Sequence, residues 1–336
     1  MHSLCNMLTY KRPEGSDTQA EFCRKYIEPV FGVPDRHGNY IMAIGDKPNI
    51  LFTAHHDTVH KNGGIQKIIV MNDVVSVSDS TQSSCLGADC TTGIYIILNM
   101  IEAQVPGVYA IFAGEELGCV GSTALINDNP TWINDLDAVI SFDRKGDNSV
   151  ITHQSGLRTA SDEFAKSFAK AVGLKQLKPD PYGSYTDSNE FAHLVSECTN
   201  ISVGYYNQHT KNETQDLLFV DKIVDAVINA DWSKLVFKRN PEDYAHDHYW
   251  YADDKYGYGY DEYDDRERMR RLVDLYPSAV ARMLSEYGFT YHSLQDELGF
   301  SEYNYDYMWT SDDDEQLEME EFNKSFSSQY ATRRYR

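Results

Sequence analysis

The sequence predicts an α/β fold in which a mixed, mostly parallel central sheet lies between helices. Three observations lead to this prediction. Short apolar segments alternate with amphipathic segments over residues 1–239, as they do in chains that build parallel sheets. The 336 residues are enough to bury a full core without disulfides. Polar motifs follow the apolar segments one after another, as is typical of the carboxyl edge of such a sheet.

Five short apolar segments are predicted to be strands, because their length and their bounding polar residues suit buried strands. These segments are residues 39–45, 49–55, 108–114, 136–143 and 200–206. Residues 67–77 are predicted to form a hairpin whose turn is Asn72-Asp73, since these two residue types favour tight turns.

Four amphipathic segments are predicted to be helices, because their apolar residues recur at helical spacing. These segments are residues 21–31, 93–103, 161–173 and 219–235. Gly173 ends the third of them, as glycine commonly does. Because helices separate consecutive strands, the strands are expected to run largely parallel and to be covered on both faces.

The composition argues against several classes of protein. The chain carries 30 Lys and Arg against 52 Asp and Glu, a formal net charge of −22, which disfavours nucleic-acid binding. Its mean hydropathy is −0.52, no apolar run approaches the roughly 18 residues that span a bilayer, and the N-terminus has no signal-peptide pattern. We expect a cytoplasmic protein without membrane contact, whose six scattered cysteines stay reduced.

The acidic residues are concentrated near the C-terminus. Residues 240–336 hold 23 acids and 10 bases, a net charge of −13, against 29 acids and 20 bases, or −9, for residues 1–239. Fifteen of the 24 tyrosines also lie in 240–336. We therefore predict a main domain over 1–239, a flexible acidic linker over 240–263, and a small helical extension over 264–336 with a disordered end. The region from 240 is a candidate surface for a protein partner or for self-association.

Five polar motifs occur where predicted strands end or a helix begins. They are His55-His56-Asp57, Asp89, Glu115-Glu116, Asp143 and His209. Taken singly, each can be explained as a polar loop, and Asp89 as a helix cap. The coincidence of all five at one sheet edge favours a common site instead.

The residue types in these motifs suit a pair of divalent metal ions. Adjacent acids such as Glu115 and Glu116 repel each other unless a cation or a proton lies between them. Imidazole and carboxylate donors together suit zinc, manganese or cobalt. One carboxylate flanked on each side by an imidazole and an acid is the donor arrangement of a two-metal hydrolytic centre.

The ordered series HxD, GAD, GEE, FD and H resembles the co-catalytic dinuclear zinc exopeptidase clan, over about residues 1–236. The clan includes aminopeptidases, carboxypeptidases and aminoacylase-type deacylases. The resemblance implies two bound metal ions, zinc or else cobalt or manganese. The implied ligands are His55 and Asp143 for the first metal, Glu116 and His209 for the second, and Asp89 as the bridge. It also implies that Asp57 orients His55 and that Glu115 is the general base.

The interval between Asp143 and His209 is 209 − 143 = 66 residues. One branch of the clan inserts a whole lid domain here, so this chain is expected to be a lidless, single-domain member. Residues 183–191 resemble the Ser- and Asp-rich loop of single-domain aminopeptidases, whereas HHDTV and HTKNE look closer to the lid-bearing branch. The sub-family is therefore left open.

The resemblance implies hydrolysis of a terminal amide bond in a peptide or amino-acid conjugate, with Glu115 moving the proton of a metal-activated water. The acidic character favours a free α-amino end, hence an aminopeptidase rather than a carboxypeptidase or an N-acyl-amino-acid deacylase. Candidates for substrate contacts flank the ligands: Arg144, Tyr185, Tyr205, Tyr206 and Asn207. An alternative function of a different kind is a non-catalytic binding module that acts through the acidic tail. The adjacent glutamates Glu115 and Glu116 argue against it, because a protein that binds no metal has no need of two neighbouring acids that repel each other.

Overall fold

The computed structural model describes residues 3–242 except 79, 81, 129 and 130, together with residue 244 and isolated positions between 273 and 290. The linker expected over 240–263 and the extension expected over 264–336 lie almost entirely outside the described residues.

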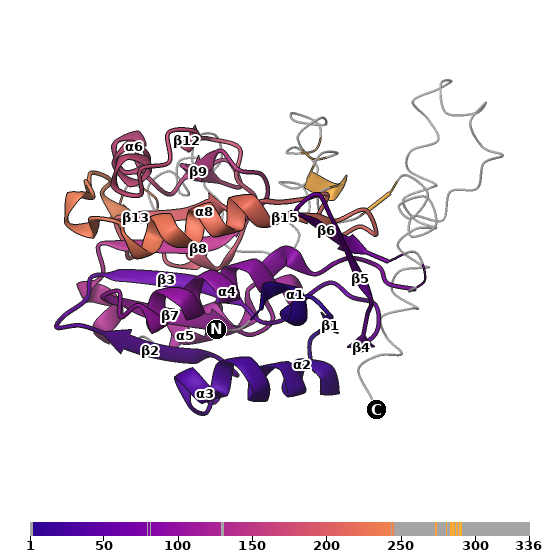
Figure 1. Cartoon of the computed structure of the whole chain (residues 1–336). Helices are drawn as coiled ribbons and strands as arrows, with labels where there is room; N and C mark the ends of the chain where they lie inside the picture. The colour runs from indigo at the N-terminus through magenta and orange to yellow at the C-terminus, as the bar shows by residue number, and fades with distance from the viewer. Residues whose placement is uncertain are drawn as a thin grey trace, which may run out of the picture. The chain divides into compact units, whose positions relative to one another are not determined.

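A seven-stranded sheet forms the centre of the fold, in the order β12-β9-β13-β8-β3-β7-β2 (Figure 1). Its strands are β2 (Tyr40–Ile44), β3 (Ile50–His55), β7 (Gly107–Phe112), β8 (Ala138–Arg144), β9 (Ser149–Ile151), β12 (Lys178–Asp180) and β13 (Glu197–Ser202). Strands β7, β3, β8 and β13 run parallel, whereas β2 is antiparallel to β7 and β9 is antiparallel to β13. The sheet is therefore mixed and mostly parallel, as predicted.

Helices flank this sheet. They are α1 (Leu4–Met7), α2 (Asp17–Phe22), α3 (Glu28–Phe31), α4 (Ala88–Glu102), α5 (Val120–Asn127), α6 (Asp162–Ala171), α7 (Asp187–Glu190) and α8 (Leu217–Ile228), with a π-helical stretch at Cys23–Ile27 and 3₁₀ turns at Glu115–Leu117, Thr131–Asp135 and Trp232–Lys234. Helix α6 begins after Ser161, whose hydroxyl accepts a hydrogen bond from the Phe164 N–H, as N-cap serines do. Within the described part of the chain, no helix has the length and apolar character needed to cross a membrane.

Apolar cores cover both faces of the central sheet. Neighbouring residues of a strand point to opposite faces, so they enter different cores. In β3, Phe52 belongs to a larger apolar core together with side chains of α4, α6 and α8. Its neighbour Leu51 belongs to a smaller core together with side chains of α5 and of the segment after α7. Figure 1 shows α4 and α8 lying across one face of the sheet. The predicted sandwich is confirmed.

The predicted helix over 219–235 needs one correction. Helix α8 ends at Ile228, and Trp232 lies in a separate 3₁₀ turn. The break lets the Trp232 ring pack on Phe52 and Phe168, at centroid distances of 4.9 and 6.0 Å. Three further elements have no clear sequence signal because they are short: β9, β12 and α5.

A smaller sheet has the order β14-β15-β6-β5. Its strands are β5 (Ile68–Met71), β6 (Val74–Val77), β14 (Tyr205–Tyr206) and β15 (Thr214–Asp216). Strands β5 and β6 are the predicted hairpin, and its turn residues Asn72 and Asp73 have φ of 51° and 63°, which these residue types adopt more readily than most. Two more strand pairs are β1 (Tyr10–Lys11) with β4 (Gly64–Ile65) and β10 (His153–Gln154) with β11 (Leu157–Arg158).

The segment between Asp143 and His209 belongs to the central sheet. It contains β9, β12 and β13, with α6 and α7 between them. No separate domain is inserted here, in agreement with the expected lidless form.

Candidate metal centre

Three parallel strands end at the same edge of the sheet with ionisable side chains. His55 is the last residue of β3, Asp143 is the next-to-last residue of β8, and Glu115 and Glu116 open the turn that follows β7. Because β8, β3 and β7 are parallel neighbours, these side chains meet at the carboxyl edge, where open α/β sheets bind ligands.

The first group of contacts is centred on His55, whose side chain is almost fully buried. Its Nε2 lies 3.2 Å from Asp89 Oδ1, 3.4 Å from Asp143 Oδ1 and 3.8 Å from Glu115 Oε2. Asp89 comes from the first turn of α4. One imidazole nitrogen thus faces three carboxylates whose residues are far apart along the chain.

The other nitrogen of His55 faces Asp57. Nδ1 lies 3.3 Å from Asp57 Oδ1, and the same carboxylate accepts hydrogen bonds from the backbone N–H groups of Glu115 and Glu116 at 3.1 and 3.0 Å. Burial acts to raise the pKa of Asp57, but the bond to His55 and the Glu116 N–H outweigh it and lower that pKa. Asp57 therefore stays ionised and ties the end of β3 to the turn after β7.

The second group of contacts is centred on His209, in the loop between β14 and β15. Its Nε2 lies 3.2 Å from Asp89 Oδ2 and 3.2 Å from Glu116 Oε1. Asp89 therefore stands between two imidazoles and turns one oxygen toward each. This is the position expected for a bridging carboxylate.

Three acids of the cluster lack enough positive charge nearby, whereas the two imidazoles outweigh burial and lower the pKa of Asp89. Burial raises the pKa of Glu115 and of Glu116, and burial followed by the charge of Asp89 raises the pKa of Asp143 to about 7. For His209, burial alone would lower the pKa, but Glu116 and Asp89 raise it to about 12. Such a cluster favours bound cations, because they supply the missing countercharge.

Two atoms of the cluster are left without a hydrogen bond. Among the described residues, Glu116 Oε1 and His209 Nε2 are buried and lie 3.2 Å apart, and neither makes a hydrogen bond of acceptable geometry. Donor atoms of His55, Asp89 and Glu116 also lie within 4.8 Å of one another. Buried nitrogen and oxygen atoms that lie close together without hydrogen bonds are suited to act as ligands of a cation. The residues present therefore fit divalent metal ions.

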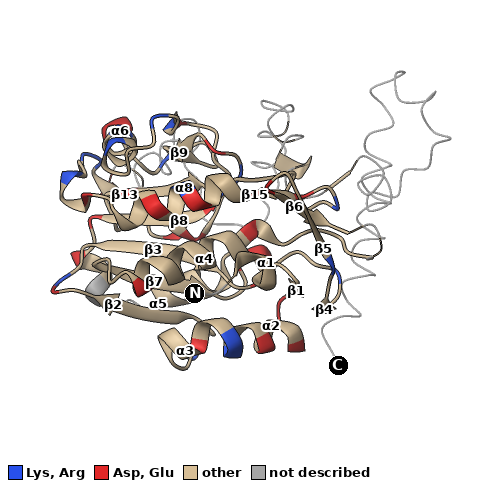
Figure 2. Cartoon of the chain, viewed as in Figure 1, with Lys and Arg blue, Asp and Glu red and all other residues tan. Residues whose placement is uncertain are grey.

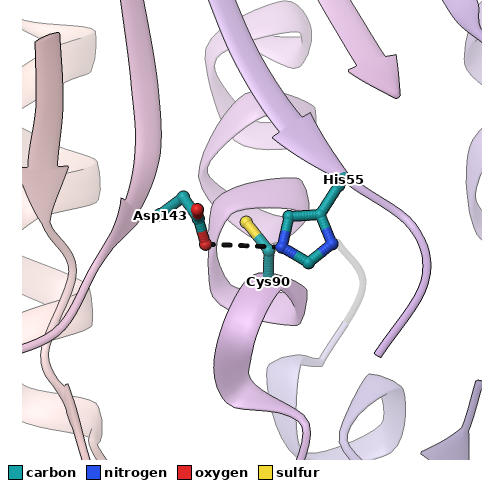
Figure 3. Close-up of side chains that lie close together, drawn as sticks. All are labelled: His55, Cys90 and Asp143. Carbon is teal, nitrogen blue, oxygen red and sulfur yellow. Dashed lines mark ion pairs between the residues drawn. The ribbon is translucent and has the colours of Figure 1, made fainter. Parts of the chain in front are cut away.

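Cys90 lies beside this cluster, although the sequence marks it only as an ordinary reduced thiol. Donor atoms of His55, Cys90 and Asp143 lie within 4.8 Å of one another, and Figure 3 shows the three side chains coming from β3, α4 and β8. The Cys90 thiol donates to the Phe142 carbonyl at 3.2 Å. Burial raises the pKa of Cys90 well above its usual value, so the thiol stays protonated.

Three polar residues hold Asp143, and the sequence analysis selected one of them, Tyr205, only as a candidate for substrate contact. The Thr186 hydroxyl donates to Asp143 Oδ2 at 2.8 Å. Asn200 accepts from the Asp143 N–H and donates to the Asp143 carbonyl, both at 2.9 Å. The Tyr205 hydroxyl donates to the same carbonyl at 2.9 Å. Thr186 had a signal as part of the Ser- and Asp-rich loop 183–191, and Tyr205 was named as flanking the ligands, whereas Asn200 had no signal.

Glu213 holds the loop that carries Asp89. This fully buried carboxylate accepts hydrogen bonds from the backbone N–H groups of Leu86, Gly87 and Asp89, at 2.8, 2.8 and 3.1 Å. In the sequence, Glu213 belongs to the segment HTKNE, where it follows His209 by four positions. Glu213 therefore couples the loop of one imidazole to the loop of the shared carboxylate.

The candidate substrate residues lie in different environments. Arg144 Nη2 donates to the Tyr182 carbonyl at 2.9 Å and lies 3.7 Å from Asp180, so its guanidinium is directed toward β12. Tyr205 is buried, as its bond to Asp143 requires. His56, the variable residue of HxD, is also buried, and its Nε2 lies 3.1 Å from the Gly38 carbonyl.

The remaining candidates are more accessible. Tyr185 and Tyr206 are 36% and 38% exposed. The Tyr185 hydroxyl donates to Glu190 at 2.5 Å, and the Asn207 amide donates to the Asn212 carbonyl at 3.4 Å. Tyr185, Tyr206 and Asn207 are therefore all exposed, whereas Tyr205 is buried.

The fold and the donor set define the class of the protein, a metallopeptidase of the co-catalytic zinc exopeptidase clan. Residues 39–247 match peptidase family M28, and the chain belongs to this family. A comparison with curated protein sequences gives no significant match.

Solved structures share the fold at low sequence identity. Aminopeptidase PepT from Bacillus cereus has a TM-score of 0.52 and 15% identity, over 67% of this chain and 95% of its own. A tripeptidase from Staphylococcus aureus has a TM-score of 0.54 and 14% identity, over 67% and 95%. An aminopeptidase from the archaeon Desulfurococcus kamchatkensis has a TM-score of 0.51 and 13% identity, over 67% and 93%. At these identities the likeness establishes the fold alone.

Proposed function

We propose that this chain is an aminopeptidase that uses two divalent metal ions, zinc or else cobalt or manganese, to hydrolyse the amide bond next to a free α-amino end. The observation that carries the proposal is the position of Asp89. Its two carboxylate oxygens each lie 3.2 Å from a different imidazole, one of His55 and one of His209. A carboxylate shared in this way is the central ligand of a two-metal hydrolytic centre.

Five side chains hold the metals in this proposal. The first metal would be held by His55 and Asp143 and the second by Glu116 and His209, and Asp89 would contribute to both. Asp57 accepts a hydrogen bond from the Nδ1–H of His55, which leaves Nε2 free to act as a ligand. When bound, the two ions lower the pKa of a water molecule and stabilise negative charge on the scissile carbonyl.

Glu115 is the proposed general base. Its Oε2 lies 3.8 Å from His55 Nε2, and Asp57 accepts a hydrogen bond from its backbone N–H, so its place beside the ligands is well defined. Burial raises the pKa of Glu115, which suits a group that takes a proton from water and returns it to the leaving amine.

Two observations favour recognition of the amino end. Arg144, the candidate receptor for a substrate carboxylate, is engaged with the Tyr182 carbonyl and with Asp180. The cluster itself is rich in carboxylates, which attract an ammonium group. The names of the similar structures, two aminopeptidases and a tripeptidase, point in the same direction.

The test combines a metal count with a substrate panel. Zinc-loaded protein is expected to hold two metal ions per chain by plasma emission and to cleave amino-acid anilides that have a free amine. The same anilides with an acetylated amine are expected to resist. Cleavage of N-acyl amino acids instead would identify a deacylase, and stepwise release of C-terminal residues would identify a carboxypeptidase.

Two variants test the assigned roles. Glu115→Gln is expected to keep both metals and to lose about 10²- to 10⁴-fold in kcat, whereas Asp89→Asn is expected to lose metal as well. Wild-type turnover in Glu115→Gln would rule out its role as the base. A protein that binds no divalent ion and cleaves nothing in the panel would favour the non-catalytic binding module.

We also propose that residues 1–239 form the catalytic domain, followed by the linker 240–263 and the extension 264–336 as a region for a partner protein or for self-association. Limited proteolysis within 240–263 that leaves an active core would support this division. Loss of activity on such cleavage would instead show that the C-terminal region completes the site.

A further inference from the structure

Cys90 lies at the metal centre, but the proposed function gives it no role. Its side chain is fully buried, and it directly follows Asp89 in the first turn of α4. Its sulfur, one imidazole nitrogen of His55 and one carboxylate oxygen of Asp143 all lie within 4.8 Å of one another. In Figure 3 the sulfur lies on the side of the imidazole ring that faces Asp143.

The spacing of these three donor atoms suits one metal ion. Ligands at about 2.0–2.3 Å from a tetrahedral ion lie about 3.4–3.6 Å from one another. His55 Nε2 and Asp143 Oδ1 are 3.4 Å apart. The sulfur lies within 4.8 Å of its two neighbours, so a shift of at most about 1.2 Å brings it to coordination distance. A cation in this cluster is expected on independent grounds, since Glu116 Oε1 and His209 Nε2 are buried without a hydrogen bond of acceptable geometry.

The packing around Cys90 keeps its sulfur in this place. A Cβ atom added to Gly93, one turn further along α4, would lie 2.5 Å from the Cys90 sulfur and 3.1 Å from Ala54 Cβ. The sulfur therefore occupies space that any side chain at position 93 would fill. Its hydrogen bond to the Phe142 carbonyl, at 3.2 Å, is of a weak kind, so little is lost when the sulfur binds a cation instead.

A thiolate at this place needs a further positive charge beside it. Burial and the Asp143 carboxylate raise the pKa of Cys90, and His55 does not outweigh them. Helix α4 has no Lys or Arg, and Figure 2 accordingly shows no blue along it. The guanidinium of Arg12 donates to Thr91. A bound cation supplies the missing charge, because a thiol that coordinates a metal is deprotonated outright.

We propose that Cys90 is a thiolate ligand of the first metal, together with His55 and Asp143, and that it makes this position selective for zinc or cadmium over manganese. On binding, the S–H bond breaks, a sulfur–metal bond forms and the proton leaves to solvent. Thiolates are soft ligands that suit zinc, whereas manganese favours oxygen ligands. The inference rests on the proposed metal centre, but it does not depend on the proposed reaction or substrate.

Cobalt spectroscopy tests the ligand directly. Co²⁺ bound to a thiolate has a sulfur-to-metal charge-transfer band in the near ultraviolet, which imidazole and carboxylate ligands do not produce. We expect this band in the wild type loaded with two equivalents of Co²⁺, and we expect Cys90→Ser to lose it while cobalt stays bound. Cys198→Ser is the matched control, because Cys198 is also fully buried and donates to a carbonyl. Cys119→Ser controls for the thiol that lies 3.9 Å from Glu115. Both controls are expected to keep the band.

A second measurement tests the selectivity. The ratio of cadmium affinity to manganese affinity should be at least about 10-fold higher in the wild type than in Cys90→Ser, since even groups outside the ligand shell change metal affinity by this much. Circular dichroism checks that the variant is folded, and Cys90→Ala is a second variant that is expected to lose the band as well.

The outcomes separate this inference from the proposed activity. Two bound cobalt ions in the wild type without the band, a band that persists in Cys90→Ser, or equal affinity ratios would each overturn the inference. The band without cleavage of any substrate would support the inference and reject the proposed reaction, whereas cleavage without the band would do the reverse. A wild type that binds no cobalt would overturn both.

Discussion

Glu213 provides a quantitative test of how the loop of Asp89 is held. In Glu213→Gln, one carboxylate oxygen becomes an NH₂ group, which cannot accept a hydrogen bond. If the amide oxygen takes the Oε2 position, it keeps the bonds from Leu86 and Gly87 and loses the bond from the Asp89 N–H. The lost bond therefore lies at Asp89, the proposed bridging residue.

The expected magnitude follows from that lost bond. A hydrogen bond to a charged group contributes about 1.5–3 kcal/mol. Removal of the negative charge offsets part of the loss in the metal-free protein, because Asp89 repels the buried Glu213 carboxylate and raises its pKa. We expect Glu213→Gln to lower the free energy of unfolding of the metal-free protein by about 2 kcal/mol. We expect its metal affinity to fall about 10- to 100-fold, as when groups that orient metal ligands are removed.

The assay needs both quantities. Denaturant unfolding in the presence of a chelator measures stability, and competition with a chelating dye measures zinc affinity. Glu102→Gln, an exposed residue at the end of the same helix α4, is the control and is expected to change neither. Wild-type zinc affinity in Glu213→Gln would refute the positioning role, whatever its effect on stability.

Three further predictions concern pH, metal and chain length. His60 is buried and neutral, and burial lowers its pKa to about 4; because the unfolded chain takes up a proton near pH 6.5, stability falls as pH drops from about 6.5 to 4. Between pH 7 and 5 this loss is about 2 kcal/mol. In His60→Gln, denaturant unfolding should show a free energy of unfolding that no longer falls by this amount; the same fall with pH as in the wild type would contradict the assignment to His60. Metal removal should lower stability by about 2.7 kcal/mol for each site when free metal stands at 100 times Kd, measured as a shift in denaturant midpoint on adding chelator; an unchanged midpoint would exclude a metal bound to the folded state. Tyr244 is buried and its hydroxyl bonds with Asn189, so a chain ending at 239 should be less stable by about 3 kcal/mol than one ending at 247; equal melting temperatures would contradict this.

Much of the fold could be predicted because its signals are local. Apolar segments and helical periodicity marked the strands and helices in order, and Asn72-Asp73 marked the hairpin turn. The helix predicted over 219–235 was wrong in its last turns, because local periodicity does not register the packing of Trp232 on Phe52. Strands β9 and β12 were missed because three residues are too few to show a strand pattern in the sequence.

The candidate site shows the same division. The motifs named each proposed ligand, since acids and histidines after apolar strands are visible one motif at a time. The groups that hold those ligands were largely missed. Asn200 bonds to Asp143 across 57 positions and Glu213 to Asp89 across 124, and no short pattern links residues so far apart.

The sequence by itself determined the identity and order of the donors and the class of fold, because both follow from local periodicity and residue chemistry. Only the tertiary structure decided which oxygen of Asp89 faces which imidazole, that Arg144 is directed toward Asp180, and that Glu116 Oε1 and His209 Nε2 are buried without a hydrogen bond. The physical reason is that these features depend on strand order and side-chain packing. The apolar cores on both faces of the sheet hold the acids together against their mutual repulsion.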